Sequence, residues 1–394
     1  MRILYLTPYV PSPVHVRPYQ LIRHLARLGH EVTLICLARR GEGAEALAEL
    51  RRCCREVIAV PTSRGRALAQ ILRAFASPLP LQAAYGASPE LVARARQRAE
   101  CHDVVHIEHL RGMSYGPPLH DYPRVLDAVD CISLLFERAL RQSPTLVSRG
   151  RALLDLARTR RAESRFGEIF PLVVVTAVED GWALRQLQAP DAPAPQIEVV
   201  PNGVDLGQCI PTPSTREPAT LVLSGKMSYH ANEAAALLLG RGIMPLIWRE
   251  RPDVRCVIVG LRPTRAVRAL AADARITVTG GVPSIVPFLS SATIAVAPLR
   301  YGVGIQNKVL EAMATATPVV ATPQAARALH ARPGEEIVLA ATPRAFADAV
   351  LALLDSPQRR AELGAAGRRY VEAHHNWQHS ASRMVGLYAS ASRQ

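Results

Sequence analysis

Short apolar runs alternate with amphipathic segments along the first half of the chain, and this alternation limits the fold more than any other feature. The runs are typical of buried strands, and the segments between them have the spacing of helices. In residues 19–29, for example, Leu21, Leu25 and Leu28 share one face and Gly29 follows as an end signal. Strands that alternate with helices predict a doubly wound parallel sheet. The expected strands are residues 2–7, 31–37, 56–60, 103–107, 124–129 and 172–178.

A proline-rich stretch interrupts this alternation at residues 189–218 and is typical of an interdomain linker with limited flexibility. The alternation then resumes, and the tail is helical, with Trp377 starting its last segment. We therefore predict an α/β protein with two Rossmann-like, doubly wound parallel-sheet domains that face each other across a cleft. The predicted boundaries are an N-terminal domain at 1–188, the linker at 189–218, a C-terminal domain at 219–375 and a final helix at 376–394. The expected strands of the second domain are residues 219–225, 254–260, 275–280, 293–299 and 318–322, with helices near 232–248 and 264–272 and another opened by Pro283.

Composition agrees with two domains and restricts the class of partner. The chain has 394 residues, of which 49% are apolar, so each half has enough material for a core. The formal charge of +14 favours anionic partners such as nucleotides, nucleic acid or an acidic membrane surface. Aromatic residues are only 5% and no nucleic-acid recognition motif is present, so nucleic acid is not expected.

Targeting and redox signals indicate a cytoplasmic protein. No signal peptide is recognisable, and the longest apolar runs, such as residues 170–178, fall well short of the ~20 residues that a spanning helix needs. The seven cysteines are an odd number without a CxxC pair, which is typical of reduced thiols. We expect a cytoplasmic protein that is soluble or peripheral on the inner face of the membrane.

The stretch GVGIQNKVLEAMATATPVVAT (302–322) carries the strongest sign of a binding site. Its glycines precede a short helix that begins near residue 305 between two buried strands. A helix N-terminus carries unpaired N–H groups and partial positive charge, so it can hold a phosphate, and Lys308 adds a full charge. Glu311, one turn on, suits a ribose diol. The alternative is a solvated Lys308–Glu311 pair without function.

Four stretches together resemble the family 4 glycosyltransferases of the GT-B fold: VVPNGVD, GKMSYHANEAAALLL, VTGGVPSIVPFLSSATIAVAPL and GIQNKVLEAMATATPVVAT. The last is most similar to a bacterial branch associated with exopolysaccharide synthesis and exosortase-linked systems. The resemblance implies a nucleotide-diphosphate sugar as co-substrate, retaining chemistry without a metal or other cofactor, and a C-terminal helix that returns to the N-terminal domain. It implies that Glu311 holds the donor ribose and that Lys226 contacts the diphosphate. The implied donor-binding residues are Ser224, Gly225, Lys226, Pro298, Gly302, Gly304, Ile305, Gln306, Asn307, Lys308 and Glu311.

Two positions depart from the family pattern in the C-terminal half. The first glutamate of the family's Glu-x7-Glu pair falls on Val303, which removes the usual contact to the sugar. The family's second basic residue falls on Asn232, and we hypothesise that Lys308 replaces its charge.

The N-terminal domain is expected to receive the acceptor, a lipid-linked or growing exopolysaccharide glycan. Arg17 in this domain and Asn202 in the linker are the candidate acceptor- or anion-binding residues. The stretch DVVHIEH (103–109) is similar to the family's Asp-x2-His-x-His run, so Glu108 and His109, together with Lys226, are the candidate catalytic residues. One of the two could instead only cap the strand. A zinc site is not expected, because His102 and His106 face one way on a strand and His109 the other.

Two arginine-rich helical segments, 63–75 and 150–166, are candidates for contact with anionic lipid, the alternative being an ordinary solvated surface. Among other functions, an NAD(P)-linked oxidoreductase is disfavoured because no GxGxxG follows a first strand. A non-catalytic relative that binds nucleotide sugar or lipid, and a nucleotide-sugar epimerase of similar fold, are the remaining alternatives. The sequence therefore predicts a glycosyltransferase.

Overall fold

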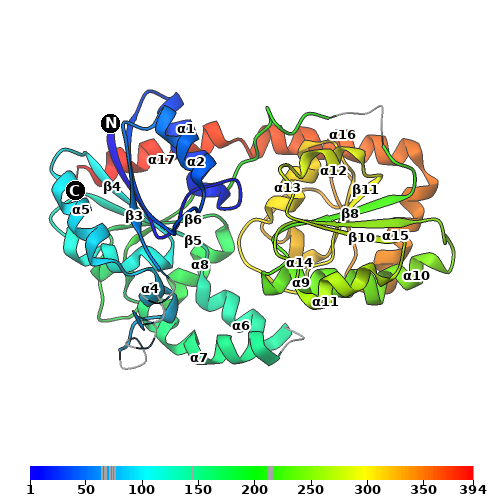
Figure 1. Ribbon diagram of the computed structural model, residues 1–394, viewed down its shortest axis with the longest axis horizontal. Coiled ribbons are helices and arrows are strands. Elements are labelled where there is room, and N and C mark those ends of the chain that lie inside the picture. The colour runs from blue at the N-terminus through cyan, green and yellow to red at the C-terminus, as the bar shows by residue number, and fades with distance from the viewer. Residues whose placement is uncertain are drawn as a thin grey trace. The chain divides into compact units, whose positions relative to one another are not determined.

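The computed structural model describes residues 1–63, 65, 69, 70, 72, 74, 77–142, 146–211 and 216–393. The chain divides into two compact units (Figure 1). The first unit comprises Met1–Glu137, Arg151–Pro201 and Trp377–Gln394, and the second comprises Arg138–Gly150 and Asn202–Asn376. The chain therefore changes unit at Glu137–Arg138, Gly150–Arg151, Pro201–Asn202 and Asn376–Trp377, and the third of these points lies inside the predicted linker.

In the described residues, the first unit is built on seven parallel strands in the order β3-β2-β1-β4-β5-β6-β7. All six predicted strands are confirmed. The last one is shorter than expected, because Val178 starts a helix whose first turn carries Glu179 and Asp180. The strands are β1 (Arg2–Thr7), β2 (Glu31–Ala38), β3 (Glu56–Pro61), β4 (Val104–Glu108), β5 (Arg124–Val129), β6 (Leu172–Val175) and β7 (Gln196–Val199).

Helices cover both faces of this sheet, as the alternation predicts. On one face α1, α2 and α17 form a core with Tyr5, Leu21, Trp377, Met384 and Tyr388, so the last helix completes the unit that begins the chain (Figure 1). The opposite face is covered mainly by the helices between β3 and β7. The helices are α1 (Val16–Arg27), α2 (Ala44–Cys53), α4 (Leu81–Gly86), α5 (Pro89–Ala99), α6 (Ile132–Gln142), α7 (Leu146–Glu163), α8 (Val178–Leu187) and α17 (Trp377–Ala391), with short 3-10 turns at Leu110–Tyr115, Pro117–Leu119 and Phe166–Glu168.

The second unit contains six described strands, again parallel, in the order β10-β9-β8-β11-β12-β13. The five strands predicted here are confirmed, and a two-residue strand extends the edge. Leu223, Ile258, Val296 and Val320 are among the strand residues of its buried core. The strands are β8 (Thr220–Ser224), β9 (Arg255–Val259), β10 (Ile276–Gly280), β11 (Ile294–Ala297), β12 (Val319–Ala321) and β13 (Val338–Leu339).

The helices of the second unit follow the predicted positions with two differences. The segment expected as one helix near 232–248 contains a π-helical turn at Leu239–Ile243, and the helix expected to open at Pro283 begins three residues later. The helices are α9 (His230–Leu238), α10 (Met244–Trp248), α11 (Arg265–Arg268), α12 (Val286–Ser291), α13 (Asn307–Ala314), α14 (Pro323–Ala326), α15 (Pro343–Asp355) and α16 (Pro357–His374), with a 3-10 turn at Ala269–Ala272.

The structure describes one of the two arginine-rich segments more fully than the other. Most of segment 63–75 lies outside the described residues, whereas segment 150–166 forms most of α7 and the turn after it. None of the helices that the structure describes combines the length and the hydropathy that a membrane span requires.

Candidate functional site

The predicted phosphate site lies where β8, β9 and α13 meet in the second unit. The loop that joins β11 to α13 turns at Gly304, whose φ of +63° favours glycine. The helix begins at Asn307, two residues later than predicted, so Ile305 and Gln306 belong to the loop. In the first turn, the N–H of Val309 donates to the carbonyl oxygen of Gln306 at 2.9 Å. A helix N-terminus favours an anion because its first N–H groups have no carbonyl partners one turn earlier.

Lys308 is extended along the edge of the sheet to the loop after β8. Its ammonium nitrogen donates to Oδ1 of Asn232 at 2.8 Å and lies 3.4 Å from Oε1 of Gln306. Asn232 in turn donates through Nδ2 to the carbonyl oxygen of Lys226 at 3.1 Å. A Cβ atom on Gly225 would stand 3.4 Å from Cε of Lys308. The structure thus brings Gly225, Asn232 and Lys308 together, as the substitution hypothesis requires.

Two glycines shape the floor of this site. Gly225 and Gly260 both have φ of +144°, a conformation that side chains rarely adopt. A Cβ atom on Gly260 would stand 1.8 Å from the carbonyl oxygen of Gly225, so the loops after β8 and β9 touch through their backbones. Gly260 is a site-shaping residue that the sequence analysis missed, although a glycine directly after a strand is a readable signal.

Burial shifts the charges of the Lys308–Glu311 pair toward neutrality. Burial lowers the pKa of the Lys308 ammonium to about 8, against the opposing effect of Glu311. Burial likewise raises the pKa of the Glu311 carboxyl to about 7, although Lys308 opposes the shift. Both side chains are half-buried rather than solvated, so the alternative of an ordinary surface ion pair does not describe them.

Both lysines of the chain lie at this site. Of the 47 basic Lys and Arg residues, only Lys226 and Lys308 are lysines. Both of them contribute to this site, Lys226 through its carbonyl oxygen, with its side chain exposed. A lysine ammonium is a compact charge whose pKa shifts readily on burial, whereas a guanidinium stays charged. Burial of Lys308 therefore gives this site a basic group that can change its charge near pH 8.

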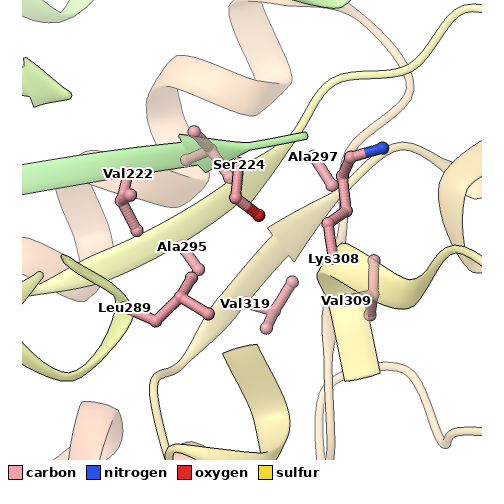
Figure 2. Close-up of a pocket in the computed structure, with 9 residues that line it drawn as sticks. Val222, Ser224, Leu289, Ala295, Ala297, Lys308, Val309 and Val319 are labelled. Atoms are coloured by element: carbon pink, nitrogen blue, oxygen red, sulfur yellow. The ribbon is translucent and has the colours of Figure 1, made fainter. Parts of the chain in front are cut away.

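A small apolar cavity lies beneath the site (Figure 2). In Figure 2 the hydroxyl of Ser224 points into the cavity, whereas the Lys308 ammonium extends past Ala297 and away from it. The other lining residues are Val222, Leu289, Ala295, Val296, Val309 and Val319. The aliphatic stem of Lys308 thus closes an apolar space while its charge remains at the outer edge.

The remaining predicted donor residues surround α13. Pro298 and Ile305 are buried, and the amide of Gln306 donates to the carbonyl oxygen of Val303 at 3.2 Å. Asn202 donates through Nδ2 to Oδ1 of Asn307 at 3.2 Å, and both residues belong to the second unit. Its role in binding an acceptor or an anion stays a prediction. Gly302 is half-buried in the loop.

Beside this loop the structure adds a contact that the sequence did not indicate. His230, the first residue of α9, bonds the hydroxyl of Tyr301 through Nδ1 at 2.7 Å, and the two rings are stacked. This pair fixes the start of the loop.

In the first unit, Glu108 lies inside a buried polar network rather than at the surface. Tyr5 donates to Oε2 of Glu108 at 2.9 Å, and Nε2 of His106 lies 3.3 Å from the same oxygen. Tyr388 of α17 lies 2.7 Å from Nδ1 of His106. Burial raises the pKa of Glu108 to about 7 and lowers that of His106 to about 3. Glu108 is fully buried in this network, and the catalytic role predicted for it stays a prediction.

Arg17 belongs to the same network. Its Nε donates to Oδ2 of Asp127 at 2.7 Å and its Nη1 to the carbonyl oxygen of Val200 at 3.0 Å. The side chain is 4% exposed. The sequence predicted an anion contact here, but the anion that Arg17 meets is the internal carboxylate of Asp127, because the helix that carries it packs directly on the sheet.

The described residues contain one group with metal-ligand geometry, formed by His106, Glu108 and Asp127. Their ligand atoms lie within 4.8 Å of one another. The guanidinium of Arg17 already pairs with Asp127. Tyr5 is hydrogen-bonded to Glu108 and Tyr388 to His106, so the three residues do not suit a metal ion. The three histidines considered for zinc also have separate partners: His102 bonds Thr33, His106 bonds Tyr388 and His109 bonds Arg111.

His109 lies at the carboxyl end of β4, next to the buried network. Its backbone has φ 65° and ψ 156°, a conformation that is nearly confined to glycine. Its Nδ1 accepts the Arg111 backbone N–H at 3.2 Å, which leaves Nε2 as the protonated donor. Burial lowers its pKa to about 3, so the ring is neutral at pH 7. His109 therefore caps the 3-10 turn at Leu110–Tyr115 and also offers a hydrogen-bond donor.

Other residues at this edge were missed by the sequence analysis. Tyr9 stacks on His15 at 4.1 Å between ring centroids, and its hydroxyl lies 3.4 Å from Oε1 of Glu108. Asp130 follows β5 and accepts from the Thr176 hydroxyl at 3.3 Å, and burial raises its pKa to about 6. An aspartate directly after a parallel strand is a signal that could have found this residue.

Part of the second unit matches a known protein family. Residues 218–356 match the family described as Glycosyl transferases group 1. The GDP-mannose-dependent monoacylated alpha-(1-6)-phosphatidylinositol monomannoside mannosyltransferase of Corynebacterium glutamicum is 27% identical over 234 residues. That alignment covers 54% of this chain and 61% of the relative, so it spans less than two thirds of the relative's length.

Solved structures resemble the chain over nearly its whole length. Sucrose-phosphate synthase from Thermosynechococcus elongatus superimposes with a TM-score of 0.72 at 18% identity, covering 99% of both chains. HepE of Anabaena in complex with UDP superimposes with a TM-score of 0.68 at 14% identity, covering 99% of this chain and 100% of HepE. The chain has the GT-B glycosyltransferase fold, and its second unit contains the segment that matches the group 1 glycosyl transferases.

Proposed function

We propose that this protein is a glycosyltransferase that moves a sugar from a nucleotide-diphosphate sugar to an acceptor glycan. The observation that carries the proposal is the meeting of Lys308, Asn232 and Gly225 at the start of α13, with Glu311 one turn further on. This arrangement offers an ammonium and helix N–H groups to a diphosphate and a carboxylate to a ribose. The family match of residues 218–356 and the UDP complex of HepE support the same assignment.

In the proposed reaction, the bond between the anomeric carbon and the diphosphate oxygen breaks, and its electron pair leaves with the nucleoside diphosphate. The acceptor hydroxyl oxygen forms the new glycosidic bond, and its proton passes to an oxygen of the leaving nucleoside diphosphate. Lys308, Lys226 and the start of α13 stabilise the charge that develops on the leaving diphosphate. Because these groups belong to the chain, the proposed reaction needs no metal or further cofactor at the phosphate.

His109 is the residue we assign to the acceptor side. Its neutral ring carries the proton on Nε2, so it can orient a hydroxyl by donating a hydrogen bond. We further propose that the acceptor is a lipid-linked or growing exopolysaccharide glycan, as in the branch that GIQNKVLEAMA resembles. The lipid-linked acceptor named for the Corynebacterium relative supports this substrate class. Retention of configuration and the cytoplasmic location stay predictions.

The position of Val303 supports a second candidate, a non-catalytic relative that binds nucleotide sugar. Val303 is an almost buried aliphatic residue where the related enzymes have a carboxylate toward the sugar. Binding then uses the same lysines, but transfer is lost.

A panel of UDP-, GDP-, ADP- and TDP-sugars, with NAD(P) alongside, tests the proposal by thermal shift, since preferential binding to the folded state raises the unfolding temperature. We expect one nucleotide-sugar class to stabilise the protein, and Glu311→Gln to weaken this stabilisation because the amide accepts fewer ribose hydrogen bonds. Stabilisation by NAD(P) alone would overturn the proposal. A nucleotide sugar that binds but is not turned over with any lipid-linked acceptor favours the non-catalytic candidate.

A further inference from the structure

Helix α7 is inverted, with polar side chains toward the first unit and apolar side chains toward solvent. The residues of its buried face are Ala152, Asp155, Thr159 and Glu163, which follow one another at helical spacing. On the opposite side Leu153 is 72% exposed and Leu154 is 50% exposed. A helix that belongs only to a protein core has the reverse pattern.

Carboxylates attach α7 to the unit. Asp155 accepts the backbone N–H of Leu81, the first residue of α4, at 3.0 and 3.1 Å. Glu163 accepts the N–H groups of Ile132 and Ser133, which begin α6, at 2.7 and 3.1 Å. Each carboxylate thus lies at the positive end of another helix. Because these contacts hold α7 in place, the fold does not require its outward leucines.

The outward side of α7 is also positively charged. Leu153, Leu154 and Arg161 lie on it at helical spacing, and Arg158 and Arg160 flank them. Within residues 152–163 both acidic side chains are buried, so the exposed charges there are arginines. Arg160 contacts Glu137 of α6 at 2.8 Å, and Figure 1 shows α6 and α7 side by side.

We define the α7 face as Leu153, Leu154, Arg158, Arg160 and Arg161.

We propose that the α7 face docks the protein on an anionic phospholipid bilayer. Leucines enter the boundary between headgroups and acyl chains, and the arginines contact lipid phosphates. A few isolated leucines between arginines offer too little apolar area for a stable dimer, whereas a bilayer accepts them singly. The net charge of +14 adds long-range attraction to the same partner. This inference does not depend on the sugar or the reaction.

The test is co-sedimentation of the full chain with vesicles of phosphatidylcholine mixed with phosphatidylglycerol, and with vesicles of phosphatidylcholine alone. We expect binding to the mixed vesicles that weakens as salt is raised, because the arginine contribution is screened. The double variant Leu153→Ser/Leu154→Ser is expected to bind at least about tenfold more weakly than wild type, because two leucines no longer enter the bilayer. Its thermal unfolding is expected to match that of wild type.

The matched control is Val178→Ser/Trp182→Ser on α8. These side chains are 58% and 63% exposed on the same unit, but the first turn of α8 carries Glu179 and Asp180. We expect this variant to bind vesicles as wild type does. Equal loss in both variants, equal binding of both vesicle types, or no binding at all would overturn the proposal. So would a wild-type dimer that the α7 substitutions dissociate, because the face would then join two copies of the chain.

Discussion

The ammonium nitrogen of Lys308 lies 2.8 Å from Oδ1 of Asn232, although the two residues are 76 positions apart in the chain. The resemblance to family 4 glycosyltransferases implies a basic residue at position 232, and here an asparagine at that position contacts the ammonium group of Lys308 from α13. The positive charge expected on α9 at position 232 is therefore supplied by Lys308 from α13. Since both side chains end at the same point, the charge should be transferable between them.

Moving the charge from position 308 to position 232 tests this relationship. We expect Lys308→Met to weaken binding of the nucleotide sugar by about 10- to 100-fold, because one charge-assisted hydrogen bond to the diphosphate is lost. The double variant Lys308→Met/Asn232→Arg should recover most of that loss. Isothermal titration with UDP-glucose and GDP-mannose measures both changes. Arg359→Met, which removes an exposed cation on α16, is the control, and a failure of the double variant to recover would show that position 232 does not face the phosphate.

Amine labelling offers a second test, because Lys226 and Lys308 are the only lysines. With its pKa lowered to about 8, roughly half of the Lys308 amine is neutral at pH 8, compared with under about 1% for an ordinary lysine. We expect an acylating reagent to modify Lys308 near pH 8 and a bound nucleotide diphosphate to protect it. Peptide mass spectrometry measures the extent at each lysine and at the N-terminus. Labelling of Lys308 that is the same with and without nucleotide would contradict the proposed site.

The raised pKa of Glu108 predicts how the unfolding free energy of the first unit changes with pH. Its pKa in the folded protein is raised to about 7, so its contribution to stability is complete below the ordinary pKa of 4.5 and is lost as pH rises through 7. Between pH 5 and 8 the wild type should therefore lose about 2 kcal/mol more unfolding free energy than Glu108→Gln. Titrating groups that both proteins share cancel in this difference.

Urea unfolding in a Trp182→Phe/Trp248→Phe background measures this change, because buried Trp377 is then the only tryptophan and reports on the first unit. Glu335→Gln, an exposed carboxylate, is the control. Parallel pH profiles for wild type and Glu108→Gln would refute the assignment.

Backbone strain at His109 predicts opposite effects on stability and turnover. Its φ of 65° and ψ of 156° cost on the order of 1–3 kcal/mol for a non-glycine residue. We expect His109→Gly to unfold at higher urea concentration than His109→Ala, because only glycine relieves the strain. Both variants should lose at least about tenfold in turnover if the imidazole orients a substrate hydroxyl. If turnover survives both substitutions, His109 only caps the 3-10 turn at Leu110–Tyr115 and does not orient a substrate.

Much of the fold was predictable because the strands are short apolar runs whose burial needs no knowledge of distant partners. The binding loop was predictable for a similar reason, since glycines, a lysine and a helix start lie within a few residues of one another. By contrast, the sequence could not distinguish Glu108 from His109. They are neighbours, and the unusual backbone at His109 decides which of them leaves the buried network.

The inverted helix α7 was also beyond prediction. Its arginines indicated an exposed helix, but the role of Asp155 and Glu163 depends on helix starts at residues 81 and 132, far away in the chain. Similarly, the contact of His230 with Tyr301 joins positions 71 apart. Long-range partners of this kind leave no periodic signal.

The return of α17 to the first unit has a consequence for biosynthesis. Trp377, Met384 and Tyr388 fill the core against α1 and β1, so the nascent N-terminal sheet leaves the ribosome with one apolar face covered only in part, by α1 and α2. Residues 202–376 emerge before that face can close, and the second unit has all its own strands by then. During synthesis the second unit is thus free to fold first, and the first unit waits, exposed to chaperones, for the helix that seals it.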